Sequence, residues 1–191
     1  LKKAEEDAAK KQAEEAAKKS KPHEPQKEGK PEGEGSPGDG AKINPKKKLP
    51  PNAEFELNGY KYKTDSKGRV VEVKGQLKDE SAARNNYAQR TVGKGEGRLA
   101  DDHGGHLIGS QFGGSGEKAN LVPMHKDINN YHSGEWGQME KKWASALEKG
   151  ESVEVKIMPK YTDDTMRPSS FSITEKIGDK IRKIDIENPV K

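Results

Sequence analysis

The chain contains no cysteine, so it can form neither a disulfide bond nor a metal site with thiolate ligands. Hydrophobic residues make up only 28% of its 191 positions, against 36% charged residues. That is too little apolar material for one core that uses the whole chain. No apolar run approaches the length of a transmembrane helix, and the N-terminus lacks the apolar stretch of a signal peptide. We therefore expect no membrane segment, and we expect any export to rely on something outside this sequence.

The start of the chain accounts for much of this low hydrophobic content. Residues 1–19 are mostly Ala, Glu and Lys, which favour a helix, and their only large apolar side chain is Leu1. Residues 20–48 are rich in Lys, Glu, Pro and Gly and contain no Phe, Trp or Tyr, which is typical of a disordered linker. We therefore predict a charged helix with a flexible linker over residues 1–48 and a folded domain over residues 49–191.

The charge balance is mildly basic, with a net charge of +4 at pH 7. This charge suits an anionic partner but does not identify one. The run Lys46-Lys47-Lys48 at the predicted domain boundary is either a solvated tether or a tail that binds nucleic acid.

The folded region opens with the signals of an antiparallel meander. Residues 55–57 lead into Asn58-Gly59, a strong signal for a two-residue hairpin. Residues 60–63 alternate and should pair back, and residues 69–73 form a third strand after a turn at 65–68. Further strands are expected over residues 153–157 and 171–174 and, after a Gly178-Asp179 turn, over residues 180–186.

Two helices are expected between these groups of strands. The shorter one covers residues 79–89, with Asp79 near its N-cap. The longer one covers residues 135–147 and ends before Gly150, because its apolar residues recur at spacings of three and four: Trp136, Met139, Trp143 and Leu147. We read the two tryptophans as core residues. The order of elements predicts an α+β fold with an antiparallel sheet.

The most informative segment reads Asp-Asp-His-Gly-Gly-His-Leu-Ile-Gly over residues 101–109, and residues 106–110 are expected to be extended. It places His106 beside two glycines and two carboxylates, and a neutral imidazole is the commonest general base at physiological pH. Asn120-Leu121-Val122-Pro123-Met124 and a Trp-x-x-x-Glu helix follow. A hard cation such as Mg²⁺ needs few protein ligands, because it keeps most of its water. These are the parts of a phosphodiesterase that uses one metal ion.

The segment from about Leu49 to Lys183 resembles the non-specific DNA/RNA endonuclease family, whose core is the ββα-metal (His-Me finger) motif. It looks closest to the branch found as C-terminal toxin modules of bacterial polymorphic toxins. The residues that carry the resemblance occur in the family's order: Leu49-Pro50-Pro51, Leu57-Asn58-Gly59-Tyr60, Arg90-Thr91-Val92-Gly93, Gly104-Gly105-His106-Leu107-Ile108, Asn120-Leu121-Val122-Pro123-Met124, Gly134-Glu135-Trp136 with Met139-Glu140, and Arg167-Pro168-Ser169-Ser170-Phe171.

The resemblance implies a role for each candidate site residue. His106 would be the general base that takes a proton from the attacking water. Asn129 would bind a single divalent cation, Mg²⁺ or another such as Mn²⁺, and the adjacent Asn130 is the alternative ligand. Glu140 would help to hold the water shell of that cation. Asn120 would position the catalytic loop or share in its polar network.

The sequence departs from the family pattern in two places. His103 stands where the common motif has Asp, so Asp102 either orients the catalytic histidine from a shifted position or that carboxylate is missing. Gly104 stands where the motif has Arg. Residues 131–133 look like an insertion beside the metal site, which leaves the choice between Asn129 and Asn130 open.

Substrate contacts are also predicted. Gly104 and Gly105 would let the backbone approach a phosphate with no side chain in the way. Arg90, Arg98 or Lys94 would neutralise phosphate charge.

The resemblance further implies DNA, and RNA as well, as substrate. It implies a larger polypeptide that delivers the module into the cytoplasm of a target cell, and a cognate immunity protein that protects the producer. Three alternatives compete with the enzyme. One is a nucleic-acid-binding module without catalysis, and another is an inactive docking domain. The third is a zinc site formed by His103 and His106 with His125 or His132.

Overall fold

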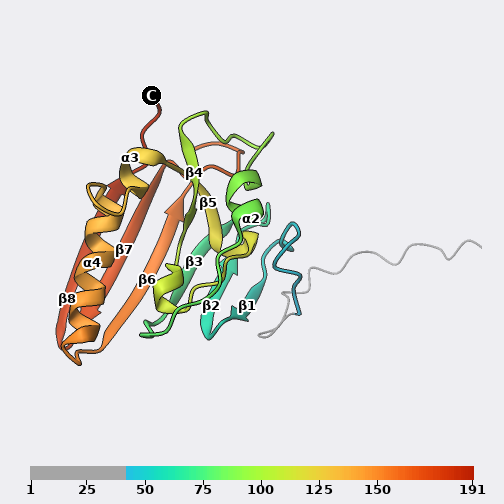
Figure 1. The fold of residues 1–191 in the computed structure, drawn as a ribbon. Helices are drawn as coiled ribbons and strands as arrows, with labels where there is room; N and C mark the ends of the chain where they lie inside the picture. The colour runs from blue at the N-terminus through green and yellow to red at the C-terminus, as the bar shows by residue number, and fades with distance from the viewer. Residues whose placement is uncertain (1–41) are drawn as a thin grey trace, which may run out of the picture. The chain divides into compact units, whose positions relative to one another are not determined.

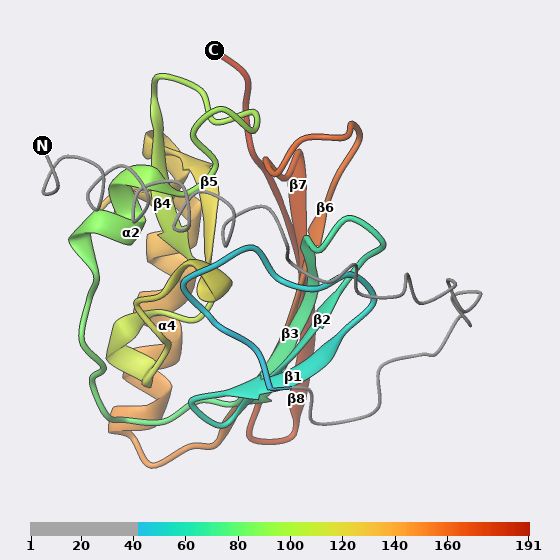
Figure 2. The same cartoon turned by 90° about the vertical axis from the view of Figure 1, so that its right-hand side faces the viewer.

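The computed structural model describes residues 42–191. The expected helix over residues 1–19 and most of the predicted linker lie outside that range, so they stay predictions. The described residues form an antiparallel sheet that is covered on one side by helices and a small second sheet (Figures 1 and 2). This arrangement confirms the predicted α+β class.

The large sheet has six strands in the order β1-β2-β3-β6-β7-β8, and every neighbouring pair is antiparallel. The bounds of its strands are β1 Glu54–Leu57, β2 Tyr60–Thr64, β3 Val70–Gln76, β6 Val153–Lys160, β7 Ser170–Ile177 and β8 Lys180–Glu187. Asn58 and Gly59 both have positive φ, as the tight hairpin between β1 and β2 requires. The predicted meander and the predicted C-terminal strands are therefore confirmed.

The second layer carries the candidate site segment. It contains a two-stranded sheet of β4 (Asp102–His106) and β5 (Leu121–His125). Its helices are α2 (Asn86–Thr91), α3 (Lys126–Asn129) and α4 (Glu135–Glu148), with 3₁₀ turns at Ser110–Phe112 and Lys118–Asn120. Figure 2 shows β4, β5, α2 and α4 together on one side of the large sheet. The succession of β4, β5 and α3 forms a ββα unit.

Helix α4 fixes the distance between the two layers. Trp136 and Trp143 are fully buried on its inner face, and the ring of Trp136 meets that of Phe171 on β7 with centroids 4.9 Å apart. The Trp143 indole N–H donates to the buried Glu175 carboxylate at 2.6 Å. The predicted helix and the core position of both tryptophans are confirmed.

The helix predicted over residues 79–89 is wrong in extent. Helix α2 begins only at Asn86, and Asn85 caps it by accepting a hydrogen bond from the Ala88 amide at 3.0 Å. The preceding residues are held by tertiary contacts instead, because the Ala82 amide donates to the Ser110 carbonyl at 2.8 Å. An asparagine cap and a distant partner therefore outweigh the helix propensity of this segment.

The extended segment also lies earlier than predicted. Strand β4 ends at His106, and residues 107–109 belong to a loop that leads into a 3₁₀ turn. The strand includes both glycines because β5 pairs with them directly, Gly104 opposite Pro123 and Gly105 opposite Val122. His106 is consequently the last residue of a paired strand.

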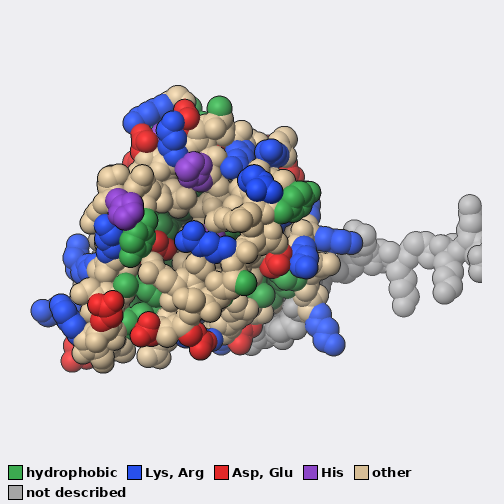
Figure 3. Space-filling model, viewed as in Figure 1, with side chains coloured by type: hydrophobic (Ala, Val, Ile, Leu, Met, Phe, Trp, Pro, Cys, Tyr) green, Lys and Arg blue, Asp and Glu red, His purple; other side chains and the backbone are tan. Residues whose placement is uncertain are grey.

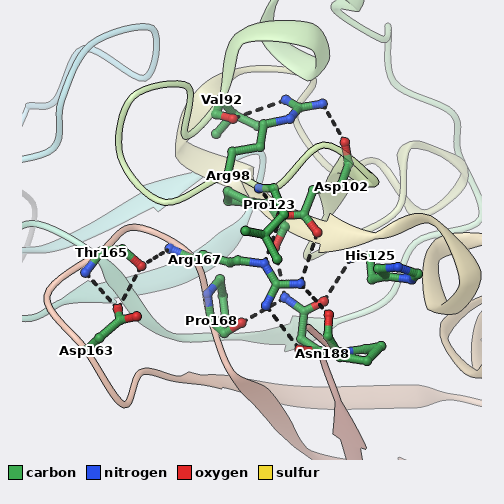
Figure 4. A network of polar contacts seen from close by, with 12 residues as sticks. Val92, Arg98, Asp102, Pro123, His125, Asp163, Thr165, Arg167, Pro168 and Asn188 are labelled. Carbon is green, nitrogen blue, oxygen red and sulfur yellow. Dashed lines mark hydrogen bonds and ion pairs between the residues drawn. The ribbon is translucent and has the colours of Figure 1, made fainter. Parts of the chain in front are cut away.

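A buried polar network fixes β4 at its first residue (Figure 4). Both carboxylate oxygens of Asp102 accept hydrogen bonds from the guanidinium of Arg167, at 2.8 and 3.0 Å, and both side chains are almost fully buried. Asn188, just after β8, continues the network by accepting from the His125 amide and donating to the Pro123 and Pro168 carbonyls. The start of β4 and the end of β5 are thereby tied to the C-terminal segment.

We predict that Asp102→Asn lowers the free energy of unfolding by about 3–5 kcal/mol, because it leaves the Arg167 charge buried without a counter-charge. Urea unfolding followed by tryptophan fluorescence measures the loss. Asp101→Asn is the matched control, since Asp101 forms an exposed ion pair with Lys126, and solvent screens such a pair so that its loss should barely change stability. Equal effects of the two substitutions would contradict the assigned importance of the buried pair.

Candidate active site

Three of the predicted site residues line one cavity of about 330 Å³. His106 reaches it from the end of β4, Asn129 from the end of α3, and Glu140 from α4. The other residues that line it are Arg84, Gln89, Gly109, Ser110, Gln111 and Tyr131. The fold therefore brings together side chains from three separate elements that the sequence could only associate through a family pattern.

The His106 ring is buried at the inner wall of this cavity. Its Nδ1 lies 3.4 Å from the side-chain nitrogen of Gln89, and its Nε2 has no hydrogen-bond partner among the described residues. Burial and, to a smaller extent, the positive charge of Arg84 together lower the pKa of His106 from 6.5 to about 4. The imidazole is therefore neutral at physiological pH.

Gly104 explains how Gln89 comes so close to this ring. A side chain at Gly104 would place its Cβ 2.4 Å from the Gln89 carbonyl oxygen, so α2 rests directly on the bare backbone of β4. A Cβ at Gly105 would lie 2.8 Å from the Cβ of Met124, in the core. Both glycines allow close packing of the chain around β4. Gly105 does not line the cavity, so it is not placed to approach a phosphate there as we predicted.

Glu140 is partly buried, and burial raises the pKa of its carboxyl group from 4.5 to about 7, although Arg84 acts in the opposite direction. The carboxylate lies against Gly109, where a side chain would place its Cβ 2.6 Å from Oε1 of Glu140. The absence of a side chain at Gly109 therefore leaves room for the Glu140 carboxylate. It is the one acidic side chain lining the cavity among residues 42–191.

The two adjacent asparagines have different surroundings. The side-chain oxygen of Asn130 accepts hydrogen bonds from the amides of His132 and Ser133, at 2.9 and 3.2 Å, so it closes the turn formed by the inserted residues. Asn129 lines the cavity. Of these two asparagines only Asn129 lines the cavity, so it is the better placed for the predicted cation.

Asn120 lies outside the cavity and is fully buried. Its side chain accepts from the Ile108 amide at 3.0 Å and donates to the carbonyls of Ile108 and Ser115, both at 2.8 Å. The Tyr62 hydroxyl donates to the same amide oxygen at 2.9 Å. This geometry gives Asn120 the loop-positioning role, in place of a direct catalytic one.

The expectation for Asp102 needs correction, and Arg98 has an additional structural role. Asp102 is bound to Arg167 and does not face His106, so its role in this structure is to anchor β4. Arg98 donates to the carbonyls of Gln89, Val92 and Asp102, between 2.8 and 3.1 Å (Figure 4). These bonds hold the guanidinium against the backbone, but Arg98 also lines the second cavity described next, so its predicted contact with phosphate stays a prediction.

A second cavity, of about 340 Å³, continues the first and shares Arg84, Gln89 and Asn129 with it. We call the two together the active cleft. Arg90 lines the second part, as predicted for a phosphate-binding residue, whereas Lys94 lies outside the cleft. Figure 3 shows Lys, Arg and His side chains gathered on this face of the molecule.

Sequence reasoning missed Arg84 and Gln89. Arg84 lies in the irregular segment before α2 and donates from Nε to the Ser110 hydroxyl at 3.1 Å. That segment was predicted to be helical, and this prediction did not indicate that the side chain of Arg84 lines the cavity. No sequence spacing marked Gln89 either, since its place beside His106 depends on the contact of α2 with Gly104.

The zinc alternative is wrong for the described residues. Within residues 42–191, no group of three or more His, Asp or Glu side chains is placed to hold a metal ion. His125 is buried, and its Nδ1 accepts a hydrogen bond from the Asp127 amide at 3.2 Å. The same range contains no helix that is both long and apolar enough to cross a membrane.

The Glu140→Gln variant should change how stability depends on pH in the metal-free protein. The folded-state pKa of Glu140 is raised from 4.5 to about 7, so the folded chain holds its proton more tightly, and stability falls as pH rises through that window. Above this window the variant should be more stable than the parent by about 1–3 kcal/mol, and below it the two should agree. Urea unfolding at pH 4 and pH 8, in the presence of chelator, measures the difference. Parallel pH profiles of the two proteins would contradict the raised pKa.

Residues 51–179 match the family model described as DNA/RNA non-specific endonuclease. A curated relative, the type VII secretion system protein EssD of Staphylococcus aureus (strain USA300), is 43% identical over 143 residues, which are 72% of this chain and 23% of the relative. The EssD protein of strain NCTC 8325 / PS 47 matches with the same figures. The chain thus spans about a quarter of the length of these relatives.

Solved structures share the fold at low sequence identity. The structure of NucA from Streptococcus agalactiae with magnesium ion bound aligns with a TM-score of 0.52 and 15% identity, and covers 72% of this chain and 83% of that one. The structure of Sda1 nuclease with bound zinc ion aligns with a TM-score of 0.53 and 13% identity, over 68% of this chain and 76% of that one. The ββα unit lies within the matched segment. The chain belongs to the DNA/RNA non-specific endonuclease family.

Proposed function

We propose that this chain is a metal-dependent endonuclease that hydrolyses phosphodiester bonds in DNA, and in RNA through the same cleft, with little sequence preference. The observation that carries the proposal is the meeting of His106, Asn129 and Glu140 in one cavity beside Arg84. A base, two oxygen donors and a fixed cation are what the hydrolysis of a charged phosphodiester needs.

The donor set fits a hard divalent cation. Asn129 and Glu140 offer oxygen atoms, which Mg²⁺ prefers, and Mg²⁺ needs few of them because it keeps several of its waters. The related structures hold a magnesium ion in NucA and a zinc ion in Sda1, which supports a divalent cation here, with Mg²⁺ or Mn²⁺ proposed. When bound, the ion would stabilise the charge that develops on the phosphate and on the leaving oxygen.

His106 would act as the general base. The Gln89 amide nitrogen can only donate, so it faces the lone pair of Nδ1, and the proton of the neutral ring lies on Nε2. This contact is long, at 3.4 Å, so a water molecule would displace Gln89 from Nδ1 and give its proton to that lone pair as it attacks phosphorus. The low pKa of about 4 keeps the ring unprotonated at neutral pH, and the negative charge of an arriving phosphate would raise this pKa toward the useful range.

Arg84 and Arg90 would hold the substrate. Both line the active cleft, and no described carboxylate forms an ion pair with either of them. Guanidinium groups bind phosphate oxygens through charge-assisted hydrogen bonds that carry no base preference. Contacts of this kind agree with cleavage that is independent of sequence.

Substitution of the base is the direct test. His106→Ala should lower the rate of plasmid cleavage in Mg²⁺ by at least about 10²-fold, because a general base contributes about 10²–10⁴-fold to such rates. The readout is the conversion of supercoiled plasmid on agarose gels. His132→Ala is the matched control, since His132 is exposed and does not line the cleft. Cleavage by the His106→Ala protein at the parental rate would remove the catalytic assignment.

The metal assignment is tested with the neighbouring asparagines. Asn129→Ala should weaken Mn²⁺ binding by about 10–100-fold, which is the size of effect expected for loss of a group that holds a metal ion, whereas Asn130→Ala should leave the affinity nearly unchanged. Titration calorimetry measures both affinities, and EDTA should stop plasmid cleavage by the parent. A larger loss for Asn130→Ala, or cleavage that resists the chelator, would contradict the assignment.

We further propose that the chain is the effector part of a larger secreted toxin. The relative EssD carries the name of a type VII secretion system protein, and this chain spans only about a quarter of it. The proposal includes delivery into the cytoplasm of a target cell and a cognate immunity protein, because an unrestrained nuclease would damage the DNA of its producer. Expression of the two histidine variants in a bacterial cytoplasm tests this role: His132→Ala should stop growth and His106→Ala should not.

A further inference from the structure

A third cavity, of about 310 Å³, lies between β5 and the start of β3, away from His106. Its rim carries five lysines, and we call it the lysine pocket: Lys46, Lys47, Lys48, Lys94 and Lys118. Its floor is mostly apolar and includes Val70, Val92, Leu121, Pro123, Tyr161 and Met166. Among the described residues that line it, Glu96 is the only one with a carboxylate.

The rim is held in place by the rest of the domain. The carbonyl of Pro45 accepts a hydrogen bond from the Ala119 amide at 3.0 Å, and Leu49 is buried in the core. Figure 2 shows the segment before β1 looping out on the side of the molecule where β5 faces β3. The run Lys46-Lys47-Lys48 therefore borders a formed cavity, which favours a binding role over a solvated tether.

The positive charge of the pocket is not neutralised within the domain. None of its five lysines forms an ion pair with another residue in the range 42–191. A concave surface with one sign of charge attracts anions, whereas an apolar floor attracts a flat apolar group and not a simple ion. A nucleotide offers both features, a phosphate for the rim and a base for the floor.

The pocket adjoins the active cleft through one turn of the chain. Arg90 lines the cleft, and the next residues, Thr91 to Lys94, line the lysine pocket. Gly93 makes this turn with a positive φ of 72°, packed against Pro123 of β5. A strand that leaves the cleft past Arg90 therefore reaches the lysine pocket around the end of α2.

We propose that the lysine pocket binds one unpaired nucleotide of the substrate strand, next to the nucleotides held in the active cleft. This inference rests on the proposed nuclease function. A base can enter the pocket only when it is unstacked and unpaired. Single-stranded nucleic acid should therefore bind more tightly than duplex of equal length, whereas a small phosphodiester that fills only the cleft should not depend on the pocket.

The test reverses two charges on the rim of the full chain. Lys94→Glu with Lys118→Glu should raise KM for a single-stranded oligothymidylate by about tenfold or more, because it replaces two phosphate-binding charges on the rim with repulsive ones, and should leave kcat within about twofold. The matched control is Lys61→Glu with Lys183→Glu, on exposed positions of β2 and β8, which changes the net charge equally. An equal rise of KM in both double variants would show that the change in net charge, and not the loss of the pocket, causes the rise. That result would overturn the proposal.

Two further measurements separate this proposal from the catalytic one. Hydrolysis of bis(4-nitrophenyl) phosphate should be the same in the parent and in both double variants, and its absence in the parent would refute the proposed nuclease site instead. In the His106→Ala protein, thymidine monophosphate should bind about tenfold more tightly than inorganic phosphate, because only the nucleotide reaches the floor. Loss of that binding in the Lys94/Lys118 variant supports the pocket. Equal affinity for the two ligands would show an anion site with no place for a base.

Discussion

The buried ion pair of Asp102 and Arg167 is the interaction on which the position of the site depends. It joins the first residue of β4 to a segment 65 residues further along the chain, and the remaining donors of Arg167 bind the carbonyls of Asn188 and Pro189. Strand β4 is five residues long, so a strand fixed at its start leaves His106 at its end little freedom. A buried pair of charges is costly to form, but it has one geometry. Here that geometry aligns the strand that carries His106, the proposed general base.

The cleft itself works against stability. Burial lowers the pKa of His106 and raises that of Glu140, because the surroundings of each group disfavour its charged form. Arg84 opposes the shift at Glu140 and adds to the one at His106. An arriving cation and an arriving phosphate would each relieve one of these two costs. Perturbed groups of this kind gather at functional sites.

The distribution of charge is more informative than its sum. The net charge of +4 over the whole chain is mild, yet arginines line the active cleft and five lysines border the lysine pocket. Elsewhere the basic residues are paired with acidic ones, as on the outer face of the large sheet, where Glu72 pairs with Lys74 and Lys156. Localised charge of this kind guides an anionic strand while the domain as a whole stays close to neutral.

The sequence by itself determined the elements that depend on neighbours in the chain: the Asn58-Gly59 hairpin, the apolar face of α4 and the pattern around His106. It also placed Asn129 and Glu140 in the site, because the order of a family motif is local information. Only the tertiary structure decided the roles of Asp102, Arg84 and the residues of α2. Those roles depend on partners that lie far away in the sequence. Hydrophobic periodicity does not indicate which distant group will form a hydrogen bond with a given donor or pack against a glycine.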